Sequence, residues 1–222
     1  MSENPKTRPA LAIQTSSEHF TNGEILELVR DPDDSSRLVL LHKNAKRTKL
    51  VPQFQCTGQT YVPALLDLGL LSQLRIPETT EPYGSAAELS NEICKLVVKY
   101  CGVGEELGFL VSCFAIATFF SDCLPSSPCL VIFGAAEEAE TLLRVLAWIC
   151  WHPLLLTDSK LSGLPEQLVF TRLIHPIVSK REIQKLLQRA PLSGFMSSSQ
   201  GVLRQSLGAC AVYLESHDLS DE

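Results

Sequence analysis

The chain lacks the features that would assign it to a nucleic-acid-binding, secreted or membrane class. Basic residues are in deficit, because 19 Lys and Arg stand against 25 Asp and Glu and leave a formal net charge of −6 at pH 7. This balance excludes a general electrostatic attraction to DNA, RNA or an anionic membrane. The N-terminal residues 1–6 lack the basic start, apolar centre and cleavage site of a signal peptide, so we expect a cytoplasmic protein.

Long apolar runs are also missing. The longest stretch, residues 107–120, is flanked by Glu105, Glu106 and Asp122. It is shorter than the roughly 20 residues that a membrane-spanning helix needs. We therefore predict a buried core helix here and no membrane partner.

The eight cysteines form no C-x-x-C pair, and six of them lie inside apolar runs. Free cysteine behaves as a small hydrophobic residue, so reduced core thiols in a cytosolic protein are the preferred interpretation. The alternative is a zinc site built from Cys123 and Cys129 with His152 or His175, but the spacing does not match the usual ligand patterns.

Composition and turn residues divide the chain into five segments. Alternating apolar stretches around turn clusters such as residues 31–36 and 56–58 are typical of β-hairpins. The expected segments are a disordered lead-in (1–20), a small β-rich module (22–76), a linker (77–84), an α/β domain (85–216) and an acidic tail (217–222).

Two helices are expected at the start of the α/β domain. Ser85 followed by Glu88 fits a capping box, and apolar residues recur at helical spacing as far as Cys101. Gly102 and Gly104 end this helix, and the apolar segment 105–121 follows as a largely buried second helix.

From residue 129 the sequence pattern predicts a strand, a helix and a strand in turn. Residues 129–133 contain no polar side chain, as expected of a central parallel strand that is covered on both faces. A helical pattern follows over 139–151, and further strands are predicted at 154–157, 168–174 and 209–215, with a helix at 179–189. This order favours an α/β fold with a parallel sheet and flanking helices.

The connection between the first strand and its helix has the register of a phosphate-binding P-loop. In the form G-x-x-x-x-G-K-[ST], the loop amides and the Lys cradle the phosphates. Gly134 and Thr141 stand where that motif requires them, whereas Ala139 replaces the second Gly and Glu140 replaces the Lys. The candidate nucleotide-binding positions are therefore Gly134, Ala139, Glu140 and Thr141, in a degenerate form.

Together with residues 117–122, 124–130 and 142–144, this register resembles helicase-like P-loop ATPases found beside primases in phages and plasmids, and bacterial relatives of them. The resemblance implies a P-loop NTPase-like parallel sheet. It also implies an acid that holds magnesium at the end of a later strand, where this chain has His175 and Pro176.

The substitutions argue against a working ATPase. Glu137, Glu138 and Glu140 would place negative charges beside a triphosphate, and a single like-charge contact costs on the order of 4 kcal/mol at an effective dielectric of 20. We therefore expect no tight binding of ATP and magnesium, no cofactor and no catalytic residue. The same acids suit the first turn of a helix.

Other residues give weaker signals. His152 is interpreted as a packing or helix-terminal residue, Asp158 as a turn or helix cap, and residues 197–201 as a flexible loop. The only basic cluster is Lys43, Lys46, Arg47 and Lys49. It is typical of a solvated hairpin edge, and it is the one local patch through which nucleic acid or an acidic partner could bind.

Three functional hypotheses remain open after the sequence. The first is a catalytically degenerate ATPase-like protein that acts as a scaffold or regulatory subunit with a protein partner. The second is a residual nucleotide binder or weak ATPase of a mobile-element replication system. The third is an interaction module unrelated to NTPases.

Overall fold

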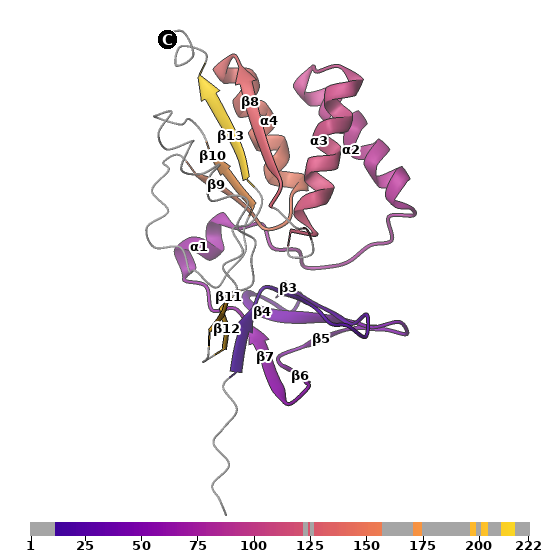
Figure 1. Ribbon diagram of the computed structural model, residues 1–222, viewed down its shortest axis with the longest axis vertical. Helices are drawn as coiled ribbons and strands as arrows, with labels where there is room; N and C mark the ends of the chain where they lie inside the picture. The colour runs from indigo at the N-terminus through magenta and orange to yellow at the C-terminus, as the bar shows by residue number, and fades with distance from the viewer. Residues whose placement is uncertain are drawn as a thin grey trace, which may run out of the picture. The chain divides into compact units, whose positions relative to one another are not determined.

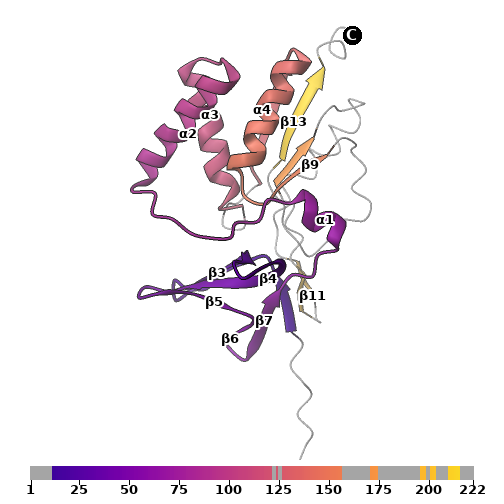
Figure 2. The ribbon, with the colours of Figure 1, turned by 180° about the vertical axis from the view of Figure 1, so that it is seen from behind.

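The computed structural model describes residues 12–121, 124, 127–156, 171–174, 196–198, 201–203 and 210–215. The chain forms two compact units (Figures 1 and 2). Unit 1 comprises Met1–Leu66 and Ile76–Thr80, and unit 2 comprises Asp67–Arg75 and Glu81–Glu222. Predictions for Cys123, Asp158, His175 and the helix at 179–189 concern residues outside the described ranges.

The described residues of unit 1 form seven strands in two small sheets. The first sheet has the order β2-β3-β4-β5 with antiparallel pairing throughout, and the second has the order β1-β7-β6. The strands are β1 (Ala12–Thr15), β2 (Ser17–His19), β3 (Ile25–Asp31), β4 (Asp34–Lys43), β5 (Thr48–Val51), β6 (Phe54–Cys56) and β7 (Gln59–Pro63). Because β1 and β2 lie inside the range expected as a lead-in, the β module begins no later than Ala12.

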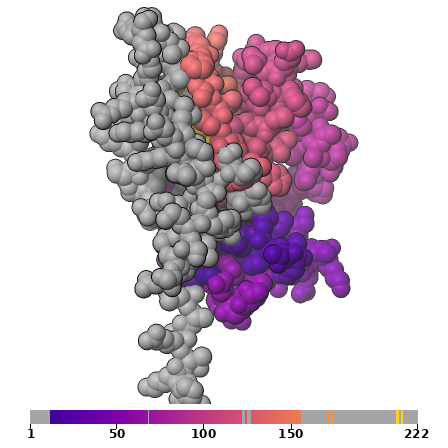
Figure 3. All heavy atoms as spheres, viewed as in Figure 1, coloured from indigo at the N-terminus to yellow at the C-terminus, as the bar shows by residue number. Residues whose placement is uncertain are grey.

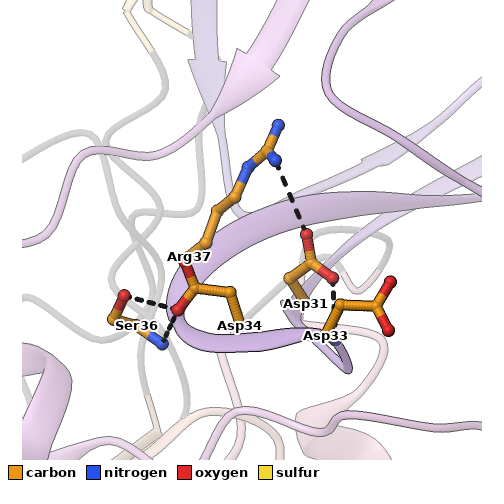
Figure 4. A network of polar contacts seen from close by, with 5 residues as sticks. All are labelled: Asp31, Asp33, Asp34, Ser36 and Arg37. Carbon is orange, nitrogen blue, oxygen red and sulfur yellow. Dashed lines mark hydrogen bonds and ion pairs between the residues drawn. The ribbon is translucent and has the colours of Figure 1, made fainter.

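The turn between β3 and β4 satisfies its own polar groups. The Asp34 carboxylate accepts hydrogen bonds from the Ser36 hydroxyl at 2.6 Å and the Ser36 amide at 3.0 Å, and these bonds lower its pKa. Asp31 accepts a bond from the Asp33 amide at 3.1 Å and lies 3.8 Å from Arg37 (Figure 4). Local side-chain bonds of this kind stabilise turns, so the acidic cluster has a structural explanation.

The turn between β6 and β7 confirms the predicted hairpin. Thr57 and Gly58 both adopt positive φ, at 48° and 77°. Two such residues in succession match the right-handed twist of the flanking strands. The Cys56-Thr57-Gly58 signal therefore predicts the hairpin correctly.

The described part of unit 2 contains four helices, and the second of them, α2, begins with the predicted capping box. The Ser85 amide donates to Glu88 at 2.7 Å, and the Glu88 amide donates to the Ser85 hydroxyl at 3.2 Å. Gly102 ends the second helix in the left-handed conformation, at a φ of 67°. The helices are α1 (Leu68–Gln73), α2 (Ala86–Cys101), α3 (Glu105–Thr118) and α4 (Ala136–Ile149).

Four strands of unit 2 form a sheet in the order β8-β13-β10-β9, and each described pair is parallel. A separate antiparallel pair joins β11 to β12. The strands are β8 (Cys129–Gly134), β9 (Pro153–Leu156), β10 (Thr171–Ile174), β11 (Met196–Ser198), β12 (Gly201–Leu203) and β13 (Cys210–Glu215).

The predicted fold class, a P-loop NTPase-like parallel sheet with flanking helices, is wrong. Most described strands lie outside the parallel sheet, in small sheets where antiparallel hairpins dominate. Strand β8, predicted to be central, is an edge strand of its sheet and pairs with β13 among the described strands. In addition, α4 begins at Ala136 rather than 139, so that Ala135 is the one residue between β8 and the helix.

The early start of α4 has a physical reason. Glu137 and Glu138 occupy its first turn, where a negative charge interacts favourably with the helix dipole. No second glycine follows Gly134 to keep the chain in an open loop. Residues that a P-loop would spread around phosphate are therefore wound into the helix.

The core of unit 2 lies between its helices and the parallel sheet. Its fully buried members come from α2, α3, α4 and the sheet, and the cluster includes Val97, Ala115, Leu143, Leu146, Leu173 and Tyr213. Burying a leucine-sized side chain stabilises a fold by about 1.5–3 kcal/mol. This cluster therefore fixes which faces of the three long helices point inward.

Helices α2 and α3 approach closely at Gly108. A Cβ atom added there would lie 2.7 Å from Val98 Cγ2, 3.1 Å from Cys94 Sγ and 3.3 Å from the Cys94 carbonyl oxygen. Valine is stiff about χ1, and a backbone carbonyl in a helix cannot move aside easily. Glycine is thus required by packing although it lowers helix propensity.

We predict that Gly108→Ala destabilises the protein. Alanine improves helix propensity by about 0.8–1.0 kcal/mol, but forcing a methyl group into a packed contact typically costs about 1–3 kcal/mol. The expected result is a lower midpoint in urea denaturation. Gly104→Ala, where an added Cβ meets no atom within 4 Å, is the control. Equal or higher stability of Gly108→Ala would contradict the close α2–α3 packing.

Candidate functional site

The residues of the predicted phosphate loop lie at the start of α4. Gly134 ends β8 with a φ of 153°, which side chains rarely adopt, and its carbonyl accepts a hydrogen bond from the Tyr213 hydroxyl at 3.2 Å. Ala139 is 2% exposed and packs in the core of unit 2. The first and second glycine positions of the motif are therefore occupied in packing.

The two polar candidates are satisfied within the helix. Glu140 accepts hydrogen bonds from Arg144 at 2.6 and 3.0 Å, one turn further along. The Thr141 hydroxyl donates to the Glu137 carbonyl at 2.8 Å. The structure thus places Gly134, Ala139, Glu140 and Thr141 near one another in sequence but does not bring their side chains around a common cavity.

A second group of polar residues is buried where α3 and α4 end and β9 begins. The Thr118 hydroxyl donates to the Ala115 carbonyl at 2.6 Å and accepts the Trp151 amide at 2.9 Å. His152 is 3% exposed, its ring lies 4.0 Å from the Trp151 ring, and its carbonyl accepts the Thr171 amide at 3.2 Å. These contacts join secondary-structure elements, so the group has a packing role.

His152 has an unusual backbone, with a φ of 39°. It follows the end of α4 and precedes Pro153, and a residue before proline is disfavoured in the right-handed helical region. The conformation lets the chain leave α4 and enter β9 directly. This position agrees with the interpretation of His152 as a packing residue.

The described cysteines form no disulfide bond with one another. The prediction of core thiols is correct for Cys150 and Cys210, which are buried, and wrong for Cys113 and Cys129, which are exposed. Burial raises the pKa of the Cys150 thiol to about 12, against a smaller opposing effect of a hydrogen bond with Thr118. Cys150 is therefore protonated at neutral pH and unsuited to act as a nucleophile.

We predict that labelling by a thiol reagent at pH 8 separates these cysteines. Since the thiolate is the reactive form, Cys113 and Cys129 of dilute native protein should react rapidly, and Cys150 should remain unlabelled until the protein unfolds. Peptide mass spectrometry after timed quenching measures each site. Rapid native labelling of Cys150 would contradict its burial.

The basic cluster lies on the β4–β5 hairpin of unit 1. Lys43, Lys46, Arg47 and Lys49 are all exposed, and Asn44 closes the turn by accepting the Lys46 and Arg47 amides at 3.0 and 2.9 Å. This is the solvated hairpin predicted from the sequence. A compact positive patch therefore exists, but within the described residues no aromatic side chain on this turn offers a surface on which bases could stack.

One face of α3 is an exposed apolar feature of unit 2. Phe109 is 55% exposed, Leu110 56% and Phe120, just beyond the helix, 49%; Cys113 is also exposed. Cys113 follows Phe109 by four residues and Leu110 by three, and Phe120 follows Cys113 by seven, so these residues lie along one side of the helix and its extension. We call this set, Phe109, Leu110, Cys113 and Phe120, the α3 outer face. Helices α2 and α3 form part of the surface seen in the space-filling view (Figure 3).

The opposite side of α3 is buried. Gly108, Val111, Phe114, Ala115 and Thr118 face the core, and the Ser112 hydroxyl donates to the Phe109 carbonyl at 2.7 Å. Small residues at 108 and 115 let α3 approach its neighbours closely. The helix is thus apolar on both sides, although one side alone is needed to hold it in the fold.

One end of the α3 outer face is negatively charged. Glu105 and Glu106 lie exposed in the first turn of α3, and within the described residues neither forms an ion pair. The surface therefore combines an apolar stripe with a negative end. Trp148 on α4 is also exposed, but the Arg75 guanidinium lies 3.1 Å from the centre of its ring and covers that ring face.

The apolar sequence of α3 is consistent with this exposed surface, but on its own it predicts a buried core helix. Residues 107–120 are apolar at nearly every position, which predicts complete burial. A helix buried on all sides and a helix with one exposed apolar face have the same sequence pattern. Hydrophobic periodicity identifies the outer face of a helix only when polar residues occupy that face. The distinction required the packing of α2 and the sheet.

Comparison with known proteins gives no relatives: no family model, no curated protein and no solved structure matches the chain. The described parts of the chain contain no cluster of three or more His, Cys, Asp or Glu residues that could hold a metal ion. None of their helices combines the length and apolar character needed to cross a membrane.

Proposed function

We propose that the chain is a protein-interaction module of a scaffold or regulatory kind, and that the α3 outer face is its docking surface. The observation that carries the proposal is the exposure of Phe109, Leu110, Cys113 and Phe120 along one side of a helix whose other side, beyond its first turn, packs in the core. Exposed apolar surface of this extent on a folded protein typically marks an interaction site.

The proposed occupant is an amphipathic helix of another protein. From Phe109 to Phe120 the stripe covers about 16 Å at 1.5 Å per residue, which is the length of three helical turns. Helices dock on such surfaces through apolar residues at i, i+3, i+4 and i+7. The negative end formed by Glu105 and Glu106 favours a partner helix with Lys or Arg at the matching end.

Two exposed leucines on α3 provide a matched test. Leu107 and Leu110 are each 56% exposed, yet Leu107 lies in the helical row of Val111 and Phe114 while Leu110 lies in the outer face. Replacing either with serine should change the free energy of unfolding by less than about 0.5 kcal/mol, because surface substitutions rarely cost more. The two variants should therefore have similar stability, but only Leu110→Ser changes the proposed docking surface.

We predict that a fluorescent amphipathic peptide with leucines on one face and lysines on the other binds the protein. Leu110→Ser should weaken this binding about tenfold, which is about 1.4 kcal/mol, and Leu107→Ser should leave it unchanged. A peptide with the same apolar face and glutamates in place of lysines should bind more weakly. Fluorescence anisotropy measures the affinity of the lysine peptide for the wild type and the two variants, and that of the glutamate peptide for the wild type.

Two outcomes would contradict the proposal. One is the absence of binding by either peptide, and the other is equal loss of affinity in Leu107→Ser and Leu110→Ser. Equal loss would indicate adsorption on apolar surface in general. Thermal melting of both variants, measured in parallel, ensures that a change in binding is not a change in folding.

A further inference from the structure

Among the described strands, β8 is an edge strand, and its own residues lack the usual protection of an edge. Its six residues, Cys129–Gly134, contain no charge and no proline, and its ladder with β13 runs through every residue without a register shift. Natural edge strands commonly carry a lysine, a proline or a β-bulge that prevents pairing with another chain. The residues of β8 include none of these devices. Figure 1 shows β8 beside β13.

The hydrogen-bonding direction along β8 follows from its pairing with β13. Cys210 lies opposite Cys129, and the Cys210 amide donates to the Pro128 carbonyl at 2.9 Å. In a parallel ladder this bond places the main-chain groups of residues 128, 130 and 132 toward β13. The amide and carbonyl of Val131 and Phe133 therefore point away from β13, toward the outer side of the edge.

Side-chain exposure follows the same alternation. Ile132 is buried in the core of unit 2 and Leu130 packs against it, so the even residues face the helices. Cys129 and Phe133 lie on the other face and are exposed, with Phe133 at 57%, and Val131 between them is partly buried. The strand thus presents a row of apolar side chains beside outward-pointing main-chain groups.

We propose that β8 is a self-association site, where a second copy of this chain adds its own β8 antiparallel and extends the sheet. A two-fold axis perpendicular to the sheet at Val131 reverses the strand direction and keeps the helices of both copies on one face. Val131 then lies opposite Val131 of the second copy, and its outward amide and carbonyl form both hydrogen bonds of that pair.

Complementary side chains favour a second copy as the occupant. In this register the large exposed Phe133 lies opposite the small exposed Cys129 of the second copy, and Leu130 lies opposite Ile132. Cross-strand pairs of aromatic and apolar residues are stabilising, and an uncharged strand brings no like charges together. A charged partner strand would gain no ion pair from β8.

The interface is small, which sets the expected affinity. One strand pair buries less than the roughly 800 Å² per partner of a standard interface, so we expect dissociation constants between about 1 and about 100 μM. Sedimentation velocity of the full chain from about 5 to about 200 μM should show a reversible monomer–dimer equilibrium.

Substitutions at Val131 test the register. Val131→Lys places two positive charges opposite each other and should weaken the dimer at least about tenfold, whereas Val131→Thr keeps the β-branched shape and should retain it. Val131→Cys should form a disulfide between the two copies of residue 131, since directly opposed strand residues lie within reach of that bond. Peptide mass spectrometry of the cross-linked dimer identifies the joined residues.

The proposal is overturned if the chain remains a monomer at the highest concentration, or if Val131→Lys dimerises as well as the wild type. Loss of the dimer in Leu110→Ser but not in Val131→Lys would also overturn it, because association would then involve the α3 outer face. The self-association site does not depend on the proposed helix-docking function. Peptide binding in the Val131→Lys monomer tests that function separately.

Discussion

The close packing of α3 on α2 is the constraint on which the rest of unit 2 depends. At Gly108 an added methyl group would meet Val98 at 2.7 Å, so this position allows a single arrangement of the two helices. That arrangement turns Val111, Phe114 and Ala115 into the core with Leu143 and Tyr213. Together with the packing of the sheet, it leaves Phe109, Leu110 and Phe120 exposed.

Local signals in the sequence predicted local structure well. The capping box at Ser85 and Glu88, the glycine that ends α2 and the hairpin turn at Thr57 and Gly58 all depend on contacts within a few residues. Such contacts are fully encoded by neighbours in the chain. The candidate site and the sheet order depend on contacts between distant segments, and the sequence pattern did not determine them.

Two apolar segments are more exposed in the structure than their sequences predicted. Residues 107–120 were predicted to form a largely buried core helix and residues 129–133 a strand covered on both faces, because both segments are mostly apolar. The structure leaves Phe109 and Leu110 exposed on α3 and Phe133 exposed on an edge strand. Both segments are therefore more apolar than the fold of one chain requires, and the two proposed associations with other chains would account for the excess.

The central claim is that the α3 outer face is open to solvent in the isolated protein. Methyl NMR with a soluble gadolinium complex measures this directly, since the complex broadens the signals of solvent-exposed methyl groups. We expect strong broadening for Leu110 and little for Leu143 and Val97, which are 1% and 0% exposed. Protection of Leu110 equal to that of Leu143, in dilute protein, would contradict the account.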